Sequence, residues 1–199
     1  MRTPSKRMRL ALLLAAIPIG LLGSGLFVWQ ASYSAFSDTT TNGANSWSAG
    51  TVTISSAPGT AMFTASGLKP GDNGTACIKV TYTGSLNSVV KLYLKNADLT
   101  GTGLATYLTF QVNEGTGNNA NCSDFAQSAN DYNAVGMGDT TKTLSGFNTT
   151  AHDYSTGLSS WSATTGGTKT YEFIWQLQDN NSAAGLTAGA TFTWEADNS

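Results

Sequence analysis

Short runs of alternating hydrophobic and polar residues dominate the chain from about residue 47 onward. Val, Tyr, Phe, Trp and Thr fill these runs, and clusters of Gly, Asn, Asp and Pro separate them. Such alternation is typical of antiparallel strands, and the 3.6-residue period of helices is almost absent. The pattern predicts strands at Trp47–Ile54, Met62–Ser66, Ala76–Thr83, Val89–Lys95, Ala105–Val112, Tyr171–Gln178 and Thr191–Ala196.

This many short strands predict an all-β fold, an antiparallel β-sandwich of the jelly-roll type with long loop insertions. The alternation also assigns a face to each side chain. We expect the core to receive Ile78, Val80, Tyr82, Phe173, Trp175, Leu177, Phe192 and Trp194, and the opposite face of the strand Ala76–Thr83 to carry Cys77, Lys79, Thr81 and Thr83. We interpret Trp175 and Trp194 as core residues, with carbohydrate stacking as the alternative.

The segment from Asn113 to Lys169 has a different composition. It is rich in Gly, Asn, Ser and Thr, and its hydrophobic residues are sparse. We expect long loops carrying one or two short elements. Because structureless loops of this length are uncommon in compact domains, the segment is either a functional excursion or a place where the strand pattern fails.

The N-terminus has the pattern of a secretion signal. Four Lys and Arg residues precede an apolar run from Leu10 to about Val28. Ser32 and Ser34 then provide the small residues of a cleavage site, so residues 1–34 are expected to be a signal peptide that is cut between Ser34 and Ala35. A retained transmembrane anchor is the alternative, since a run of about 20 apolar residues can span a bilayer.

Cleavage would leave residues 35–199 as a single domain of 165 residues, enough to bury a core. This part has no arginine, six lysines and twelve acidic residues, which gives a formal charge of −6. Nucleic-acid binding requires clustered Lys and Arg, so we expect none. The acidic, hydroxyl-rich composition suits a secreted protein, with membrane contact only through the uncleaved leader.

The chain has two cysteines, Cys77 in a predicted strand and Cys122 in the loop-rich segment. An even number of cysteines in an exported chain predicts a disulfide. Such a bridge would stabilise the fold by about 4 kcal/mol in the chain-entropy estimate. Free thiols or a metal site are the alternative, although a closed zinc site normally needs four ligands.

Candidate catalytic residues are few. His152 is the single histidine, so the chain has no His-Glu-x-x-His zinc motif, and its polar surroundings favour a solvated loop position. Asp124 and Asp131 show no spacing that defines a carboxylate pair. Residues 179–182 indicate a turn, because they lack the length of a calcium loop. We expect no catalytic residue, no metal site and no cofactor.

Four motifs occur together in a recognisable order. They are Tyr33–Asp38, Trp47–Ile54, the turn formed by Leu68, Lys69, Pro70, Gly71 and Asp72, and Gly189–Ala196. Their order and spacing resemble the TasA, CalY and camelysin family. The resemblance covers the first half of the mature chain and its last strand. Residues 113–169 show no match, and the cysteine pair departs from the typical cysteine-free members.

The resemblance implies a jelly-roll subunit of extracellular fibres in a bacterial biofilm matrix or on the cell surface. It implies cleavage by a SipW-type signal peptidase and assembly into a head-to-tail homopolymer, in which each N-terminal segment is donated as a strand to the next copy. Residues 35–45 are the candidate donor strand, beginning with Ala35, Phe36, Ser37 and Asp38 and anchored by Phe36. Head-to-tail donation does not close, so it produces filaments.

Three other interpretations remain open at this point. The N-terminal segment could be a loose tail on a monomer, because short polar termini are commonly poorly ordered. Camelysin is classed as a metallopeptidase, so the family also implies a surface enzyme. A monomeric adhesin or carbohydrate-binding sandwich would fit if Trp47 or Trp161 faced solvent.

Overall fold

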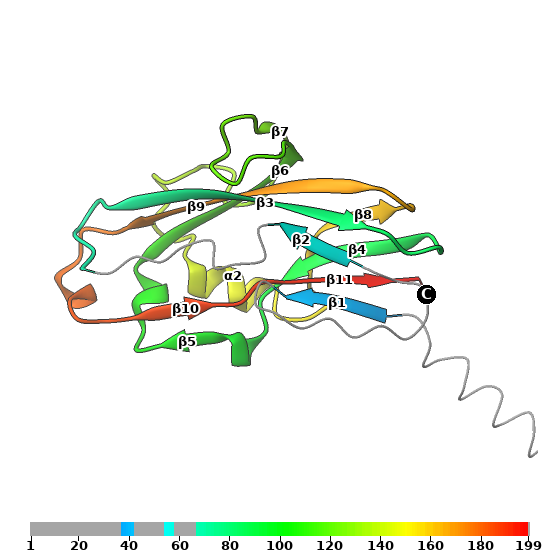
Figure 1. Cartoon of the computed structure of the whole chain (residues 1–199). Coiled ribbons are helices and arrows are strands. Elements are labelled where there is room, and N and C mark those ends of the chain that lie inside the picture. Colours follow the sequence, from blue (N-terminus) through cyan, green and yellow to red (C-terminus); the bar gives the residue numbers. More distant parts are fainter. Residues whose placement is uncertain (1–36, 42–53, 58–66, 199) are drawn as a thin grey trace, which may run out of the picture. The chain divides into compact units, whose positions relative to one another are not determined.

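Two large antiparallel β-sheets and a two-stranded one form the fold of the part that the computed structural model describes, residues 37–41, 54–57 and 67–198 (Figure 1). The first sheet has the order β1 (Ser37–Thr41), β11 (Thr193–Asp197), β4 (Ser88–Tyr93), β8 (Leu158–Ala163). The second has the order β2 (Ile54–Ala57), β3 (Asn73–Tyr82), β9 (Thr168–Leu177), β6 (Leu108–Thr116), β7 (Ala126–Tyr132). The predicted all-β, antiparallel class is confirmed.

A two-stranded sheet, three 3₁₀ turns and one short helix accompany the two large sheets in the described residues. β5 (Leu99–Gly101) pairs with β10 (Ala188–Ala190), next in the chain to the paired strands β4 and β11. Single 3₁₀ turns occupy Asn96–Asp98, Leu104–Thr106 and Asn181–Ala183. The helix α2 (Leu144–Thr150) has Thr143 as its N-cap, whose hydroxyl accepts a hydrogen bond from the Gly146 amide. Within the described ranges, no helix has the length and apolarity needed to cross a membrane.

The core lies between the two sheets, and the sequence pattern assigns most of it correctly. Side chains predicted to face inward are buried at Ile78, Val80, Tyr82, Phe173, Leu177, Phe192 and Trp194. Trp194 is completely buried, so the core interpretation is confirmed for this residue, whereas Trp175 is only half-buried. Cys77 was predicted on the outer face, yet its exposure is only 2%. The physical reason is its disulfide with Cys122, which holds a loop over that face.

Aromatic side chains join the two sheets. On the second sheet, the rings of Tyr171 and Phe173 lie 5.4 and 6.1 Å from the ring of Trp194 on β11. Phe192, immediately before β11, packs 4.7 Å from Phe173 and 5.6 Å from Phe110. Aromatic contacts at these distances add to the free energy gained by burying the rings. They therefore fix β9 and β6 over β11.

The segment from Asn113 to Lys169 contains more regular structure than the sequence predicted. It includes the end of β6, all of β7, α2 and β8, and the start of β9. Phe147 of α2 is fully buried and packs against Phe110 and Tyr132. Tyr132, Leu144 and Phe147 belong to the core cluster, so the segment is anchored by a few hydrophobic residues on a core that other parts of the chain also build.

Strand boundaries differ from the prediction in several places. Residues 104–106 form a 3₁₀ turn, so the strand expected at Ala105–Val112 begins at Leu108 and extends to Thr116. Of the strand expected at Trp47–Ile54, only Ile54 belongs to the described residues, as the first residue of β2. The strand expected at Met62–Ser66 lies outside the described residues.

Hydrogen bonds hold the turn at Leu68–Asp72 against the end of β9. Asp72 accepts a hydrogen bond from the Lys69 amide through its carboxylate at 2.7 Å, and its own amide donates to the Lys69 carbonyl. Gly71 has a φ of +85° and donates its amide to Leu177 at the end of β9. The Leu177 amide in turn donates to the Asp72 carbonyl. The turn thus closes the end of the second sheet.

Gly71→Ala should lower the free energy of unfolding by roughly 1–2 kcal/mol. The Cβ atom of alanine is strained in the left-handed backbone conformation, whereas glycine has no Cβ atom. Open space surrounds the position of the added methyl group, so no clash contributes to this loss. Urea denaturation monitored by tryptophan fluorescence would measure it. Gly138→Ala is the matched control, since its methyl group also meets open space and its φ lies outside the left-handed range. Equal stabilities of the two variants would contradict the prediction.

Candidate functional site: a strand edge and a disulfide-held loop

The N-terminal strand β1 forms one edge of the first sheet. All five of its residues pair with β11, from Ser37 opposite Asp197 to Thr41 opposite Thr193. Ser37 and Asp38, two residues of the predicted donor segment, therefore lie in a strand. Ser34, Ala35 and Phe36 lie outside the described residues, so the predicted cleavage site and the phenylalanine anchor stay predictions.

The strand that receives β1 is anchored on its other sides. β11 pairs with β4 along its full length, and its inward side chains Trp194 and Ala196 are completely buried. On the outward face, the Tyr93 hydroxyl donates to the Glu195 carboxylate at 2.6 Å. Burial, followed by this contact with Glu195, raises the pKa of Tyr93 far above its ordinary value. Loss of β1 would therefore leave a firmly held strand with an unpaired edge.

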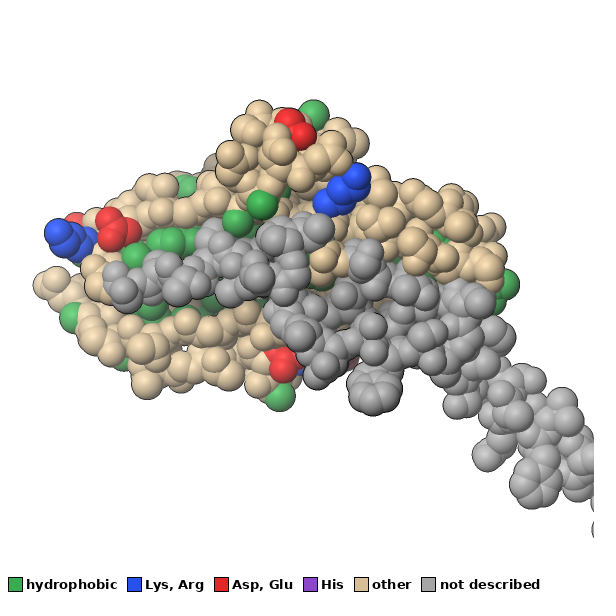
Figure 2. Space-filling model, viewed as in Figure 1, with side chains coloured by type: hydrophobic (Ala, Val, Ile, Leu, Met, Phe, Trp, Pro, Cys, Tyr) green, Lys and Arg blue, Asp and Glu red, His purple; other side chains and the backbone are tan. Residues whose placement is uncertain are grey.

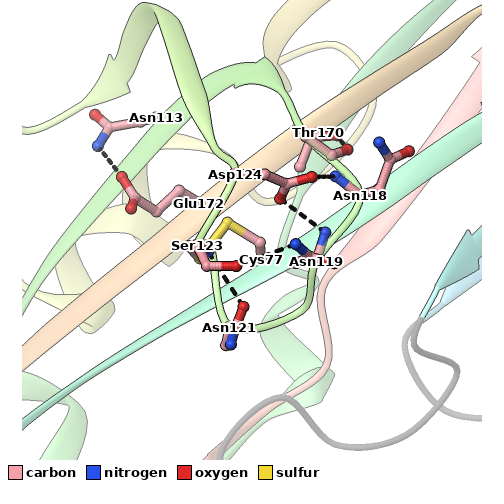
Figure 3. Close-up of a disulfide and its surroundings, with 11 residues drawn as sticks. Cys77, Asn113, Asn118, Asn119, Asn121, Ser123, Asp124, Thr170 and Glu172 are labelled. Carbon is pink, nitrogen blue, oxygen red and sulfur yellow. Dashed lines mark hydrogen bonds between the residues drawn. A yellow bond between two sulfur atoms is a disulfide. The ribbon is translucent and has the colours of Figure 1, made fainter.

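A loop after β6 folds back over the outer face of the second sheet (Figure 3). The Cys77–Cys122 disulfide joins it to β3, with a Cα–Cα distance of 5.2 Å. The predicted disulfide is thus present in the structure. The bridge joins residues that are 45 positions apart in the sequence. It therefore ties the loop that leads into β7 to the strand β3.

Asp124 organises the tip of this loop. Its two carboxylate oxygens accept hydrogen bonds from the amides of Asn119 and Asn118, each at 2.9 Å (Figure 3). These backbone bonds, Asn119 first, lower the pKa of the Asp124 carboxyl. Cys122 adopts a left-handed backbone with a φ of 60°, and its amide donates to the Asn119 carbonyl. The loop therefore has its own hydrogen-bonded shape. Asp124 has a structural role here, and nothing indicates a catalytic one.

Within the described part of the chain, one group of potential metal-ligating side chains lies close together. The two cysteine sulfurs and a carboxylate oxygen of Glu172 all lie within 4.8 Å of one another. Glu172 lies opposite Cys77 across the β3–β9 ladder. Zinc binds cysteine as the thiolate, so the disulfide removes two of the three ligands. In the disulfide-bonded state these residues do not fit a metal ion.

His152 lies in the turn that follows α2. Its Nε2 atom is 3.6 Å from the Asp153 carboxylate, and its side chain is 37% exposed. Asp153 accepts hydrogen bonds from the Ser155 hydroxyl and the Thr156 amide, which lower its pKa to about 2. The Asp153 carboxylate is therefore used to hold a turn. The arrangement agrees with the interpretation of His152 as a solvated loop residue.

A cluster of charged groups that sequence analysis missed lies between the two sheets. The Lys169 ammonium contacts the Glu114 carboxylate at 2.6 Å, and the Ser159 hydroxyl donates to the same carboxylate. Asp131 lies beside them, with one carboxylate oxygen buried and without a hydrogen-bond partner. Burial, followed by repulsion from Glu114, raises the pKa of Asp131 to about 6. No local sequence motif predicts this cluster, because its members come from four different strands, β6, β7, β8 and β9, and Asp131 lies where the β6–β7 register shifts.

A cavity of about 850 Å³ opens at the end of the sandwich beside the Leu68–Asp72 turn. The described part of its lining is mostly apolar and includes Leu68, Trp175, Leu177 and Phe192. Elsewhere, the face shown in Figure 2 is largely uncharged, with only scattered Lys, Asp and Glu side chains among its described residues.

Asp131→Asn should stabilise the fold at neutral pH. Because the folded-state pKa of Asp131 is raised, its ionisation destabilises the native state progressively as the pH rises from about 4 to about 6. After allowance for partial exposure, we expect a gain of about 1–2 kcal/mol at pH 7 that disappears near pH 3.5. Urea titrations at both pH values would measure it. Asp179→Asn, at an exposed carboxylate, is the control, and a gain of equal size at both pH values would contradict the prediction.

Comparison with known proteins is informative about the family of this chain. Residues 4–128 match the family model described as Camelysin metallo-endopeptidase, which covers more than half of the chain. The match ends within β7 and leaves α2 and the strands β8 to β11 unmatched. A search of curated proteins found no match. The matched region contains most of the predicted signal peptide, the strand β1, the Leu68–Asp72 turn and both cysteines, and the chain belongs to the TasA, CalY and camelysin family.

Proposed function

We propose that this protein is an exported structural subunit of extracellular fibres, in a biofilm matrix or on the cell surface, that assembles by exchange of its N-terminal strand. The observation that carries the proposal is the position of β1. This strand lies at the edge of a sheet, and all five of its residues are in register with β11. It is thus an element that one copy can give to another.

The energetics of pairing favour an exchange over a simple release. If β1 left, β11 would expose a row of unpaired amide and carbonyl groups. The β1 strand of a second copy offers the same main-chain groups in the same order, so it can restore every bond that was lost. All five side chains of β1 are polar, so the main chain supplies most of what holds it. Repeated donation in one direction produces a filament.

Secretion completes the proposal. Cleavage after Ser34 by a SipW-type signal peptidase would give β1 a new N-terminus only a few residues before Ser37. While the leader is attached, the segment is tied to the membrane and cannot reach another subunit. Cleavage frees the donor strand outside the cell, so assembly begins only after export. Phe36 would then enter an apolar slot of the receiving copy and set the register.

The family description names a metallo-endopeptidase, and an enzymatic role is compatible with that membership. Two properties of this chain support a non-enzymatic role. It has a single histidine, and in the described region the ligating side chains that lie close together are occupied by a disulfide. Burial of Trp194 also removes one of the two strand tryptophans considered for carbohydrate stacking.

Strand exchange predicts that cysteines placed at Thr39 and Glu195 on separate copies will join the copies. These residues are register partners on β1 and β11, and Cβ atoms at directly opposite positions of an antiparallel pair lie about 4.5–5.5 Å apart. A Thr39→Cys chain mixed with a Glu195→Cys chain should give a disulfide-linked heterodimer on non-reducing gels. Thr39→Cys mixed with Thr149→Cys, at an exposed position of α2, should give no such product.

Electron microscopy tests the same proposal at the level of the fibre. Negative stain of the mature chain, residues 35–199, should show filaments, and deletion of residues 35–45 should leave monomers. Monomers from both proteins, together with no Thr39–Glu195 cross-link, would overturn it. Filaments without that cross-link would retain assembly but reject β1 as the exchanged strand.

A further inference from the structure

We propose that reduction of the Cys77–Cys122 disulfide creates a three-ligand zinc site between the loop and the sheet. Its ligands are the thiolates of Cys122 in the loop and Cys77 on β3, and the Glu172 carboxylate on β9. The inference goes beyond fibre assembly and does not depend on it. The site lies on the outer face of the second sheet, whereas β1 lies in the first.

The three ligand atoms already lie close enough for one ion. They are all within 4.8 Å of one another. In a tetrahedral zinc site, Zn–S bonds of about 2.3 Å and Zn–O bonds of about 2.0–2.2 Å place neighbouring ligands roughly 3.5–3.8 Å apart. The two sulfurs must move apart by breaking their bond, and the carboxylate needs only a small shift. Three protein ligands would leave a fourth position for water, as in catalytic zinc sites.

The loop has contacts other than the disulfide that hold Cys122 near Cys77. The Cys77 amide donates to the Ala120 carbonyl at 2.9 Å. The Lys79 ammonium donates to the Asn118 side chain at 2.7 Å, and the Thr170 hydroxyl donates to the Gly117 carbonyl at 2.6 Å. These bonds tie the loop to β3 and β9, and the Asp124 carboxylate holds the loop's own shape. The thiols are therefore expected to stay opposite each other after reduction.

The carboxylate is also held in position. The Asn113 side-chain amide donates to Glu172 at 2.9 Å, from the neighbouring strand β6 (Figure 3). A hydrogen bond of this kind orients a ligating carboxylate and leaves its remaining lone pairs for the metal. Asn113 is itself 2% exposed, so the geometry is built into the sheet. Cys122 and Glu172 are only half-buried, which leaves a route for the ion.

The redox chemistry balances with a dithiol as the reductant. The dithiol transfers two electrons and two protons to the Cys77–Cys122 bond and becomes a disulfide itself. Both cysteines are then thiols. Zinc binding displaces one proton from each thiol, and the two protons pass to solvent. A low-molecular-weight disulfide reverses the process: it accepts two electrons from the zinc-bound thiolates and two protons from solvent and becomes two thiols, while the Cys77–Cys122 bond re-forms and the ion is released. Zinc occupancy therefore reports the redox state.

Zinc titration of the two redox forms tests the proposal. The full chain is purified in its disulfide form, half is reduced with a dithiol, and the reductant is removed by anaerobic desalting. We expect one zinc ion per chain in the reduced form and none in the disulfide form, measured by elemental analysis. Cobalt substitution should add a thiolate-to-cobalt charge-transfer band and the intense d–d bands of a tetrahedral site.

Variants assign the ligands. Glu172→Gln should weaken zinc binding by the reduced chain at least 10-fold, and Asn113→Ala by about 10- to 100-fold through loss of orientation. Glu195→Gln, which changes a glutamate on the other sheet, should bind zinc like the wild type. Circular dichroism follows the fold of each reduced protein. The proposal is overturned if the reduced chain unfolds, binds no more zinc than the disulfide form, or binds it equally well after Glu172→Gln.

Discussion

The contact between Trp194 and the aromatic rings of β9 is the interaction on which the rest of the structure depends. Trp194 is completely buried, and Tyr171 and Phe173 pack against it from the opposite sheet. Burial of such rings makes one of the largest favourable contributions available to a domain of this size. Because Trp194 belongs to β11, this packing also fixes the strand that pairs with β1 on one side and β4 on the other.

This arrangement separates two features on different sheets. The β1–β11 edge belongs to the first sheet, and the disulfide-held loop covers the outer face of the second. The edge is described by main-chain pairing, in which all five residues of β1 are in register with β11. The loop depends on specific side chains, namely Asp124, Lys79 and Thr170. Changes at one feature should therefore have little effect on the other.

The proposed zinc site depends on the state of the Cys77–Cys122 disulfide. In the described residues, the ligating side chains that lie close enough for one ion include both members of the disulfide. Whether this chain can hold a metal there is thus a question of redox state. Glu172 did not stand out in the sequence, because only the register of β3 and β9 places it opposite Cys77.

Local pattern determined the class of fold, several strands and much of the core. Alternation in Ile78, Val80 and Tyr82 is a property of the strand itself, because successive side chains point to opposite faces whatever the strand pairs with. The Leu68–Asp72 turn and the disulfide could also be predicted, since proline, glycine and cysteine carry their constraints locally.

Tertiary structure decided the strand order, the burial of Cys77, the structure within residues 113–169 and the cluster around Asp131. Each of these depends on which strands become neighbours, and pairing between strands distant in sequence leaves no local signature. Phe147 shows this most directly, since it is fully buried in a helix of seven residues with almost no periodic signal. The sequence by itself determined which residues prefer strands and turns, and only packing between the sheets decided which of them meet.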